Sequence, residues 1–392
     1  MPATLGILAA AAQTLVLVGG TVWISPTVEP IRKGTVVIEN GRIASVGRGG
    51  LRTPAGAQTI DCRGLTVLAG FWNSHAHFFE RKWEKSAATP SPELEQQVEA
   101  MTTRYGFTSV FDIASDGANT RSIRDRIERG ELRGPRIQTT GEAIVAPGAV
   151  PAPNVLRMLG NLVTANHEVT NATEAVQSAR TLLAAGSDGI KIHLQRPIPE
   201  DAIRAVVEEA HRAGKPVFVH PSTGADVLAA ARAGVDVLAH NTPFSPWDAT
   251  IVPVLLDRRV AITPTLALWR FALRHERASV QTKAVNEALA QLRAWTQAGG
   301  TVLFGNDLGA VEYDPTEEYA LMAQAGMGFH KILASLTTAP AGRFGAAERL
   351  GKIAPGLIAD LAVVEGDPAT DIRKLAAVRY TIRDGRIIFG AL

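Results

Sequence analysis

Two histidines one residue apart, His75 and His77, follow a mostly apolar run at residues 65–68. Successive side chains of an extended segment alternate between its two faces, so both imidazoles point the same way and can bind one cation. Taken alone, such a pair is more simply explained as polar loop residues that follow a strand. Its meaning depends on whether the rest of the chain supplies further ligands.

Four other segments place an ionisable residue at or near the end of an apolar run. A single one is explained by a hydrogen-bonded core histidine or a strand cap, but five segments with this feature indicate one shared polar site. Neutral imidazoles suit zinc and its neighbours, and a carboxylate adds negative charge. The residues in these four segments are Lys191 with His193, His220, His240 and Asp307.

The elements that must position these residues alternate between strand-like runs and helical patterns, for instance at residues 173–185 and 201–213. This alternation is typical of βαβ units around a parallel sheet. Eight strands predict an α/β fold of the (β/α)8 TIM-barrel type, whose active sites lie at the C-terminal ends of the strands. The strands are expected to end near His77, Ile113, Thr140, His193, His220, His240, Leu266 and Asp307.

Both ends of the chain contain β-rich segments. Asn40-Gly41 and Asp384-Gly385 each separate two apolar, β-branched runs, which is a strong hairpin signal. Strands at one end alone would leave edges unpaired, so we expect the two ends to pair with each other. The predicted organisation is a composite β-sandwich domain of residues 13–66 and 352–392 around a metal-dependent barrel of residues 67–351.

Composition narrows the ligand. The 392 residues include 40 Lys and Arg against 38 Asp and Glu, and this net charge of +2 gives no reason to expect nucleic acid or a membrane surface as a partner. We expect a small, uncharged or weakly charged substrate, and a homo-oligomer is compatible with the sequence. The single Cys62 excludes an internal disulfide and a thiolate cluster, so a metal must use His, Asp, Glu or Lys.

Residues 1–12 resemble the end of a secretory signal peptide, with small residues before Gln13 but no preceding basic residue. They are interpreted either as such a remnant or as an apolar extension of the first strand. No apolar run reaches the ~20 residues of a membrane span. The expected protein is soluble, periplasmic or secreted in the first case and cytoplasmic in the second.

This set of residues resembles the metal-dependent amidohydrolase superfamily, nearest to its imidazolonepropionase-like and Xaa-Pro dipeptidase-like branch. The resemblance spans nearly the whole chain and includes residues 351–361, which are similar to the family's return into its β-sandwich. One departure is Ala69-Gly70 and Asn73, where the family usually has Pro-Gly and an Asp. The resemblance implies two divalent ions, with zinc expected, held by His75, His77 and Asp307 on one side, His220 and His240 on the other, and Lys191 between them.

Lys191 can bridge two metals only after a chemical change. Desolvation disfavours the ammonium of a buried lysine, and the neutral amine can take up carbon dioxide to form the carbamate that the resemblance implies. The alternative is an ammonium paired with Asp307 over a single metal. Two histidine pairs provide more nitrogen ligands than one catalytic zinc needs, which favours the carbamate.

The expected activity is hydrolysis of an amide-type C–N bond, in an N-acyl amino acid, a dipeptide or a cyclic amide, by a metal-activated hydroxide. Asp307 is the expected general base and acid, with His193 as the next candidate. The same metals would also suit an ester, lactone or phosphotriester, and a metal-free interaction module is the alternative outside enzymes. Residues expected to line the substrate pocket are His193, Thr265, Trp269 and Arg270, with Arg81 and Trp83 as further candidates.

Overall fold

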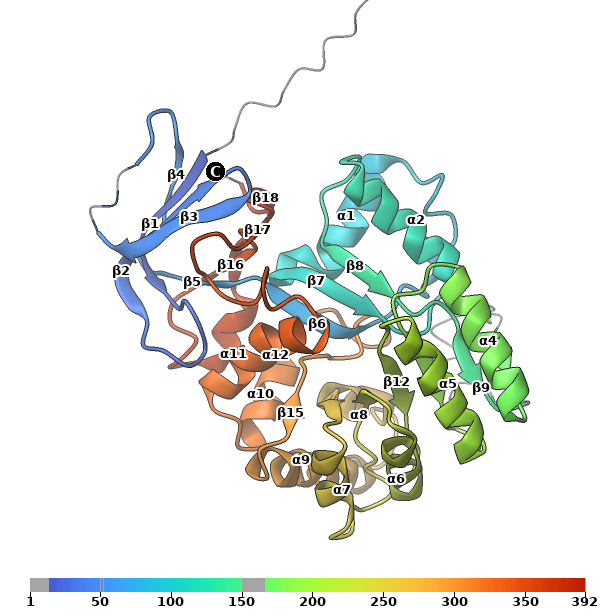
Figure 1. Ribbon diagram of the computed structural model, residues 1–392. Helices are drawn as coiled ribbons and strands as arrows, with labels where there is room; N and C mark the ends of the chain where they lie inside the picture. Colours follow the sequence, from blue (N-terminus) through green and yellow to red (C-terminus); the bar gives the residue numbers. More distant parts are fainter. Residues whose placement is uncertain (1–13, 50, 52, 150–165, 392) are drawn as a thin grey trace, which may run out of the picture.

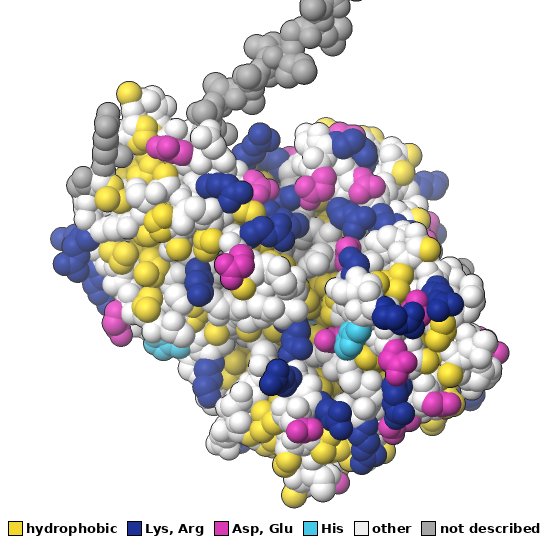
Figure 2. Space-filling model, in the orientation of Figure 1, with side chains coloured by type: hydrophobic (Ala, Val, Ile, Leu, Met, Phe, Trp, Pro, Cys, Tyr) yellow, Lys and Arg dark blue, Asp and Glu magenta, His cyan; other side chains and the backbone are white. Residues whose placement is uncertain are grey.

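The computed structural model describes residues 14–49, 51, 53–149 and 166–391, so the segment 1–12 lies outside the described residues. Within the described part of the chain, no helix has the length and apolar character that crossing a membrane requires. Lys and Arg are interspersed with Asp and Glu on the face shown in Figure 2, in keeping with the small net charge.

Strands from the two ends of the chain form one eight-stranded sheet (Figure 1). β16 pairs antiparallel with β5, and this pairing joins the C-terminal strands to the N-terminal ones, as predicted. The sheet has its own hydrophobic core. Its strands are β1 (Thr14–Val22), β2 (Ile31–Glu39), β3 (Arg42–Arg48), β4 (Gln58–Asp61), β5 (Leu65–Ala69), β16 (Leu361–Glu365), β17 (Val378–Arg383) and β18 (Arg386–Phe389).

Both predicted hairpins are confirmed. Glu39 pairs with Arg42 and Arg383 with Arg386, which leaves two residues in each turn. In each turn both central residues have positive φ, 52° and 75° at Asn40-Gly41 and 50° and 74° at Asp384-Gly385. A two-residue turn of this kind matches the right-handed twist of the flanking strands, and Asn, Asp and Gly adopt it most easily.

The middle of the chain contains two parallel sheets. The three-stranded sheet consists of β6 (Phe71–Ala76), β7 (Phe107–Asp112) and β8 (Arg136–Thr139). The seven-stranded sheet has the order β10-β9-β11-β12-β13-β14-β15. Its strands are β9 (Ala143–Val145), β10 (His167–Glu168), β11 (Ile190–His193), β12 (Val217–His220), β13 (Val237–Ala239), β14 (Ala261–Thr263) and β15 (Thr301–Val302).

The two parallel sheets contact each other in several places. The amide of Ser74 in β6 donates to the carbonyl of Phe304 beyond β15 at 2.7 Å. Only three residues separate β8, in the three-stranded sheet, from β9, in the seven-stranded sheet. The chain therefore passes directly from one sheet to the other. Between the sheets, Phe111 of β7 packs against Phe218 of β12 with ring centroids 4.7 Å apart. Residues from both sheets therefore contribute to one buried apolar cluster.

Helices follow most of these strands and cover their outer side (Figure 1). The predicted helices at 173–185 and 201–213 appear as α4 and α5, each shifted by one residue. Gly214 follows α5 with a φ of 66°, as expected at a helix end. The α-helices are α1 (Ser91–Met101), α2 (Gly117–Glu128), α4 (Ala172–Ala184), α5 (Glu200–Arg212), α6 (Gly224–Ala233), α7 (Ile251–Asp257), α8 (Leu266–Ala272), α9 (Ala278–Gln297), α10 (Thr316–Gln324), α11 (Phe329–Leu336) and α12 (Thr338–Arg343); short 3-10 turns are η1 (Arg81–Trp83), η2 (Thr103–Tyr105) and η3 (Ile372–Ala376).

Two predicted strand ends were wrong. The seventh strand ends at Thr263 rather than near Leu266, because Pro264 has no N–H for the ladder and Thr265 has a φ of 46°. Leu266 instead begins α8. The eighth strand is only β15, residues Thr301–Val302. Beyond it the chain is irregular up to Asp307, where it hydrogen-bonds to β6 rather than continuing the ladder.

Candidate metal centre

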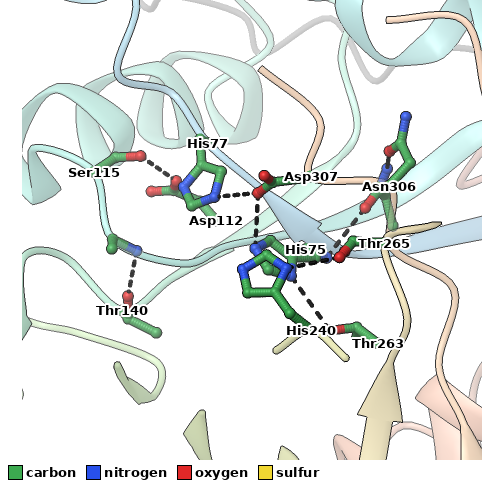
Figure 3. Close-up of polar contacts among 12 residues, drawn as sticks. His75, His77, Asp112, Ser115, Thr140, His240, Thr263, Thr265, Asn306 and Asp307 are labelled. Carbon is green, nitrogen blue, oxygen red and sulfur yellow. Dashed lines mark hydrogen bonds and ion pairs between the residues drawn. The ribbon is translucent and has the colours of Figure 1, made fainter. Parts of the chain in front are cut away.

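Three residues converge at the ends of β6 and the segment after β15 (Figure 3). The Nε2 atoms of His75 and His77 lie 2.9 and 2.8 Å from the same oxygen, Oδ1 of Asp307. All three side chains are buried, and one ligand atom from each lies within 4.8 Å of the others. We call this group the Asp307 half of the site.

The orientation of His75 is set from its other ring nitrogen. Nδ1 of His75 lies 3.3 Å from Oγ1 of Thr263, and that hydroxyl also contacts the carbonyl of Leu238 at 3.3 Å. A hydroxyl that donates to the carbonyl accepts from Nδ1–H, which leaves Nε2 as the free lone pair. Contacts of this kind fix the tautomer of metal-binding histidines.

Glycines allow the segment around Asp307 to approach β6. A Cβ on Gly305 would lie 2.6 Å from Cβ of His75, and one on Gly309 would lie 2.2 Å from the carbonyl oxygen of His77. Gly309 also has a φ of 97°. Larger residues at these two positions would push Asp307 away from the histidines.

A second group, which we call the Lys191 half, consists of the remaining predicted ligands and the neighbouring His193. Its members are Lys191, His193, His220 and His240. Its rings are packed in sequence from the Asp307 half outward: His75 to His240 at 4.5 Å, His240 to His220 at 4.4 Å and His220 to His193 at 3.8 Å between centroids. His193 and His220 are register partners on β11 and β12, which explains their stacking. The parallel register thus brings side chains from distant segments to one place.

Lys191 lies in β11 two residues before His193 and is 1% exposed. Among the described residues its side chain has no hydrogen bond and no ion pair. Burial lowers the pKa of Lys191 to about 7, an effect that the carboxylate of Asp307 opposes. The lysine is therefore a buried amine that has largely lost its preference for the charged form.

The ionisable groups of the site have pKa values that suit metal binding. Burial lowers the pKa of His75 and of His193 to about 3, and holds those of His220 and His240 well below the usual value. Burial acts to raise the pKa of Asp307, but its close contacts with His75 and His77 outweigh burial and hold that pKa well below its usual range. Near neutral pH these four imidazoles are neutral and the carboxylate is ionised.

Backbone strain is concentrated here. His240, Thr265 and Asp307 have φ values of 116°, 46° and 62°. Positive φ is unfavourable for residues other than glycine, above all for a β-branched one, and costs on the order of 1–3 kcal/mol. In this positive-φ conformation, the hydroxyl of Thr265 lies 2.7 Å from Nδ1 of His240.

Several supporting residues were not found from the sequence. Asp112, at the end of β7, accepts hydrogen bonds from the hydroxyls of Ser115, Thr120 and Thr139 and from the amide of Phe78, which follows His77. Burial raises its pKa despite these contacts. Asp112 also ends an apolar run, so the signal that identified the ligands applied to it too.

A second supporting contact joins the two segments that carry the Asp307 half. Nδ2 of Asn73 donates to Oδ1 of Asn306 at 2.7 Å, while Oδ1 of Asn73 accepts from the amide of His75 at 3.1 Å. Asn73 is the position where the sequence departs from the usual aspartate. The contact explains how an amide serves there, because it offers a donor as well as an acceptor.

The predicted substrate contacts are distributed unevenly. Trp269 lies beside the site, with its ring 6.2 Å from that of His240. Arg270 points to an exposed ion pair with Glu317 at 2.6 Å. Trp83 is fully buried against Phe78, whereas Arg81 is largely exposed. Thr265 contacts a predicted metal ligand, as described above.

The residues present fit a bound cation. Two imidazoles and a carboxylate are a suitable donor set for zinc and similar divalent metals. Nε2 of His75 is buried and makes no hydrogen bond with acceptable geometry, although it faces Asp307. Nδ1 of His193 is likewise buried without a partner among the described residues. Such unpaired buried ring nitrogens are costly unless something binds them.

The fold and the His-His-Asp group are compatible with a metal-dependent hydrolase, and the comparison with known families places the chain among hydrolases. The model of the amidohydrolase family matches residues 66–388, so the chain belongs to this family. The protein is an enzyme that hydrolyses carbon–nitrogen bonds. Members of the family generally use divalent metals.

Individual relatives have low sequence identity to this chain but match most of its length. Ochratoxinase from Aspergillus niger is 23% identical over 420 residues, which cover 92% of this chain and 84% of that protein. A Xaa-Pro dipeptidase structure with methionine bound in its active site has 25% identity and a TM-score of 0.82, covering 97% of this chain and all of that one. A prolidase complexed with N-methylphosphonate-L-proline has 26% identity, a TM-score of 0.79 and the same coverage.

Proposed function

We propose that this enzyme hydrolyses the amide bond of N-acyl amino acids or dipeptides and that two divalent metal ions, most simply zinc, serve the reaction. The observation that most directly supports this proposal is the convergence of His75 and His77 on Asp307, with Lys191 and three further histidines nearby. The dipeptidase and prolidase neighbours support this substrate class, since both are named for cleavage beside an amino acid. A cyclic amide belongs to the same class of bond.

In this proposal His75, His77 and Asp307 hold one ion, His220 and His240 hold the other, and Lys191 lies between them. When bound, divalent ions polarise a carbonyl oxygen and make water a better nucleophile near neutral pH. Desolvation keeps the imidazoles of His75, His220 and His240 neutral, so their lone pairs are available without loss of a proton. Thr263 and Thr265 hold the rings of His75 and His240 from behind.

Asp307 moves the proton. Its carboxylate is ionised near neutral pH, so it can accept a proton from the attacking water. The same carboxyl group can then donate that proton to the nitrogen that leaves when the C–N bond breaks. A reversed role of this kind is usual for a general base in hydrolysis. His193, whose Nδ1 has no partner, is the alternative proton carrier.

Lys191 serves as a carbamate in this proposal. Its neutral amine adds to carbon dioxide and a proton is released, which turns an isolated buried nitrogen into an anionic group with two oxygens. A negative group there would offset the charge of two cations in a buried site. The lack of any hydrogen-bonding partner for the lysine among the described residues supports this role over an ammonium paired with Asp307.

We also propose that residues 67–351 form a closed (β/α)8 barrel and that residues 13–66 and 352–392 form a β-sandwich domain. The hydrogen bonds between β6 and the segment after β15 support closure. The pairing of β16 with β5 supports one composite domain from the two chain ends.

The test is a metal and activity measurement on one preparation. The chain is reconstituted with zinc in the presence of bicarbonate, and elemental analysis is expected to find about two ions per chain. The same protein is assayed on N-acyl amino acids, dipeptides, lactams and aryl esters. One ion or none would contradict the binuclear site, and activity on esters alone would contradict the amide substrate.

A further inference from the structure

Phe244 is a large apolar side chain left in solvent beside the site. It is 63% exposed, the largest exposure among the bulky apolar residues of the described chain that lie at the surface. Its ring stands edge-on to that of Trp269 at 5.9 Å and 88°. Trp269 in turn stands edge-on to the imidazole of His240 at 6.2 Å and 70°. The three rings form a continuous aromatic wall that runs from the candidate metal centre to the surface.

The loop that carries Phe244 is fastened to the protein. Gln291 of α9, which is 3% exposed, accepts from the amide of Thr242 at 3.0 Å and donates to its carbonyl at 3.0 Å. The hydroxyl of Thr242 also accepts from Nε1 of Trp247 at 2.9 Å. A buried amide that satisfies both backbone groups of one residue holds the loop in place. The backbone two residues before Phe244 is therefore held by buried hydrogen bonds.

The helix that carries Trp269 is fastened in a similar way. Glu318 of α10 is fully buried and accepts from the amides of Leu266 and Ala267 at the start of α8, at 2.9 and 2.7 Å. The residue before the helix, Thr265, is tied to His240. The position of Trp269 relative to the metal centre is thus set from both sides.

Trp269 also has a hydrogen-bond donor, its indole N–H, that could bind a substrate. Its Nε1–H is buried and has no partner among the described residues. A buried indole N–H normally finds an acceptor, because leaving it unpaired costs free energy. A carbonyl or carboxylate oxygen of a bound substrate would supply one.

We propose that Phe244 and Trp269 form a subsite for an aromatic group attached next to the scissile amide, and that Nε1 of Trp269 donates to an oxygen of that substrate. The inference rests on the proposed amide hydrolysis and names its preferred substrates. Edge-to-face contact with a third ring and removal of Phe244 from water both favour an aromatic group over a small one. The subsite takes the group from either the acyl or the amine side of the bond.

The experiment measures kcat/KM of the zinc-loaded enzyme for three substrates: N-benzoylalanine, N-acetylphenylalanine and N-acetylalanine. At least one aromatic substrate is expected to exceed N-acetylalanine by about tenfold, the preference that burial of one ring supplies. In Phe244→Ala and Trp269→Ala that ratio should fall toward one, mainly through KM. Which aromatic substrate responds identifies the side of the amide that the subsite binds.

The matched control is Phe271→Leu. Phe271 lies on the same helix as Trp269, but its ring packs under the guanidinium of Arg274 at 3.9 Å. This substitution should leave the ratio unchanged. An equal fall in Phe271→Leu and Trp269→Ala would overturn the inference, because the effect would then come from the helix as a whole. So would an unchanged ratio in both wall variants.

A binding measurement separates this inference from the proposed reaction. Calorimetric titration with benzoate and with acetate needs no turnover, and the wild-type chain should bind benzoate more tightly by about tenfold. Trp269→Phe keeps a ring but removes the N–H, so it should weaken benzoate binding less than Trp269→Ala. Preferential benzoate binding without amide hydrolysis would refute only the reaction, whereas equal binding of benzoate and acetate would refute the subsite.

Discussion

The two halves of the candidate metal centre are held in different ways. In the Asp307 half, the carboxylate lies within 2.9 Å of both histidines, and hydrogen bonds that His75 donates to Thr263 and Asn73 orient its ring and backbone. In the Lys191 half, contacts between rings replace hydrogen bonds. Of its members only His240 has a polar side-chain partner, Thr265, among the described residues.

This difference indicates that one half is complete as folded and the other is not. A carboxylate already joins His75 to His77, so in the proposed site the Asp307 half needs only a cation. Among the described residues, no anionic group joins Lys191 to His220 or His240. The Lys191 half would gain such a group if the lysine became a carbamate, which makes this half dependent on carbon dioxide as well as on metal. Substitutions in the two halves should therefore have different consequences.

The largest effect is expected from Lys191→Ala. Loss of the bridging group should abolish measurable turnover and reduce the metal content from about two ions per chain to about one, because the Asp307 half keeps its ligands. Short carboxylic acids added with metal should restore part of the activity. Lys215→Ala is the control, since that lysine lies at the surface near Asp188 at 3.5 Å. Complete failure of rescue would favour the ammonium interpretation, in which Lys191 pairs with Asp307 over a single metal.

The next effect is that of Asp307→Asn. The amide keeps the size of the side chain and a weak oxygen ligand but cannot accept the proton from water. Turnover should fall by at least ~100-fold, as expected for losing general acid–base catalysis. Metal content should fall much less than in His75→Ala, which removes a stronger ligand. Turnover and metal content are measured on the same preparations. Near-normal turnover would contradict Asp307 as the proton carrier and favour His193 in that role.

Smaller effects should follow from the two threonines that hold the rings. Thr263→Val removes the hydroxyl behind His75 with little change in shape, and the affinity of the Asp307 half for metal should fall about 10-fold to 100-fold. Thr265→Val should act in the same way on His240 and the Lys191 half. Competition with a chelator, read separately for the tighter and the weaker ion, would distinguish the halves. Loss of the same ion in both variants would contradict the division.

Much of the Asp307 half could be predicted because its signal is local. His75 and His77 point to the same face because side chains alternate between the two faces of a strand. Outside the site, both hairpins were predictable for a similar reason, because their two-residue turns are recognised from adjacent residues. The hydrogen-bonding partners could not be predicted, since Thr263 is 188 positions away from His75 and Asn306 is 233 away from Asn73. The strained conformation at Thr265 was equally hidden, because a β-branched residue gives no local reason to adopt positive φ. It is the tie to His240 that accounts for it.

The last prediction concerns pH and tests the Lys191 half alone. Burial lowers the pKa of Lys191 from 10.5 to about 7, and only the neutral amine adds carbon dioxide. Raising the pH from 6 to 8 crosses that pKa upward, so the neutral fraction of the amine should rise about tenfold. Binding of the second metal ion should therefore depend on bicarbonate and proceed further at pH 8 than at pH 6. Binding of the first ion should be indifferent to bicarbonate, because His75, His77 and Asp307 need no modification. The measurement is metal content after equilibration at each pH, with and without bicarbonate, in the wild type and in Lys191→Ala. A bicarbonate effect that persists in Lys191→Ala would place the responsive group elsewhere, and its absence in the wild type would mean that both halves are complete as folded.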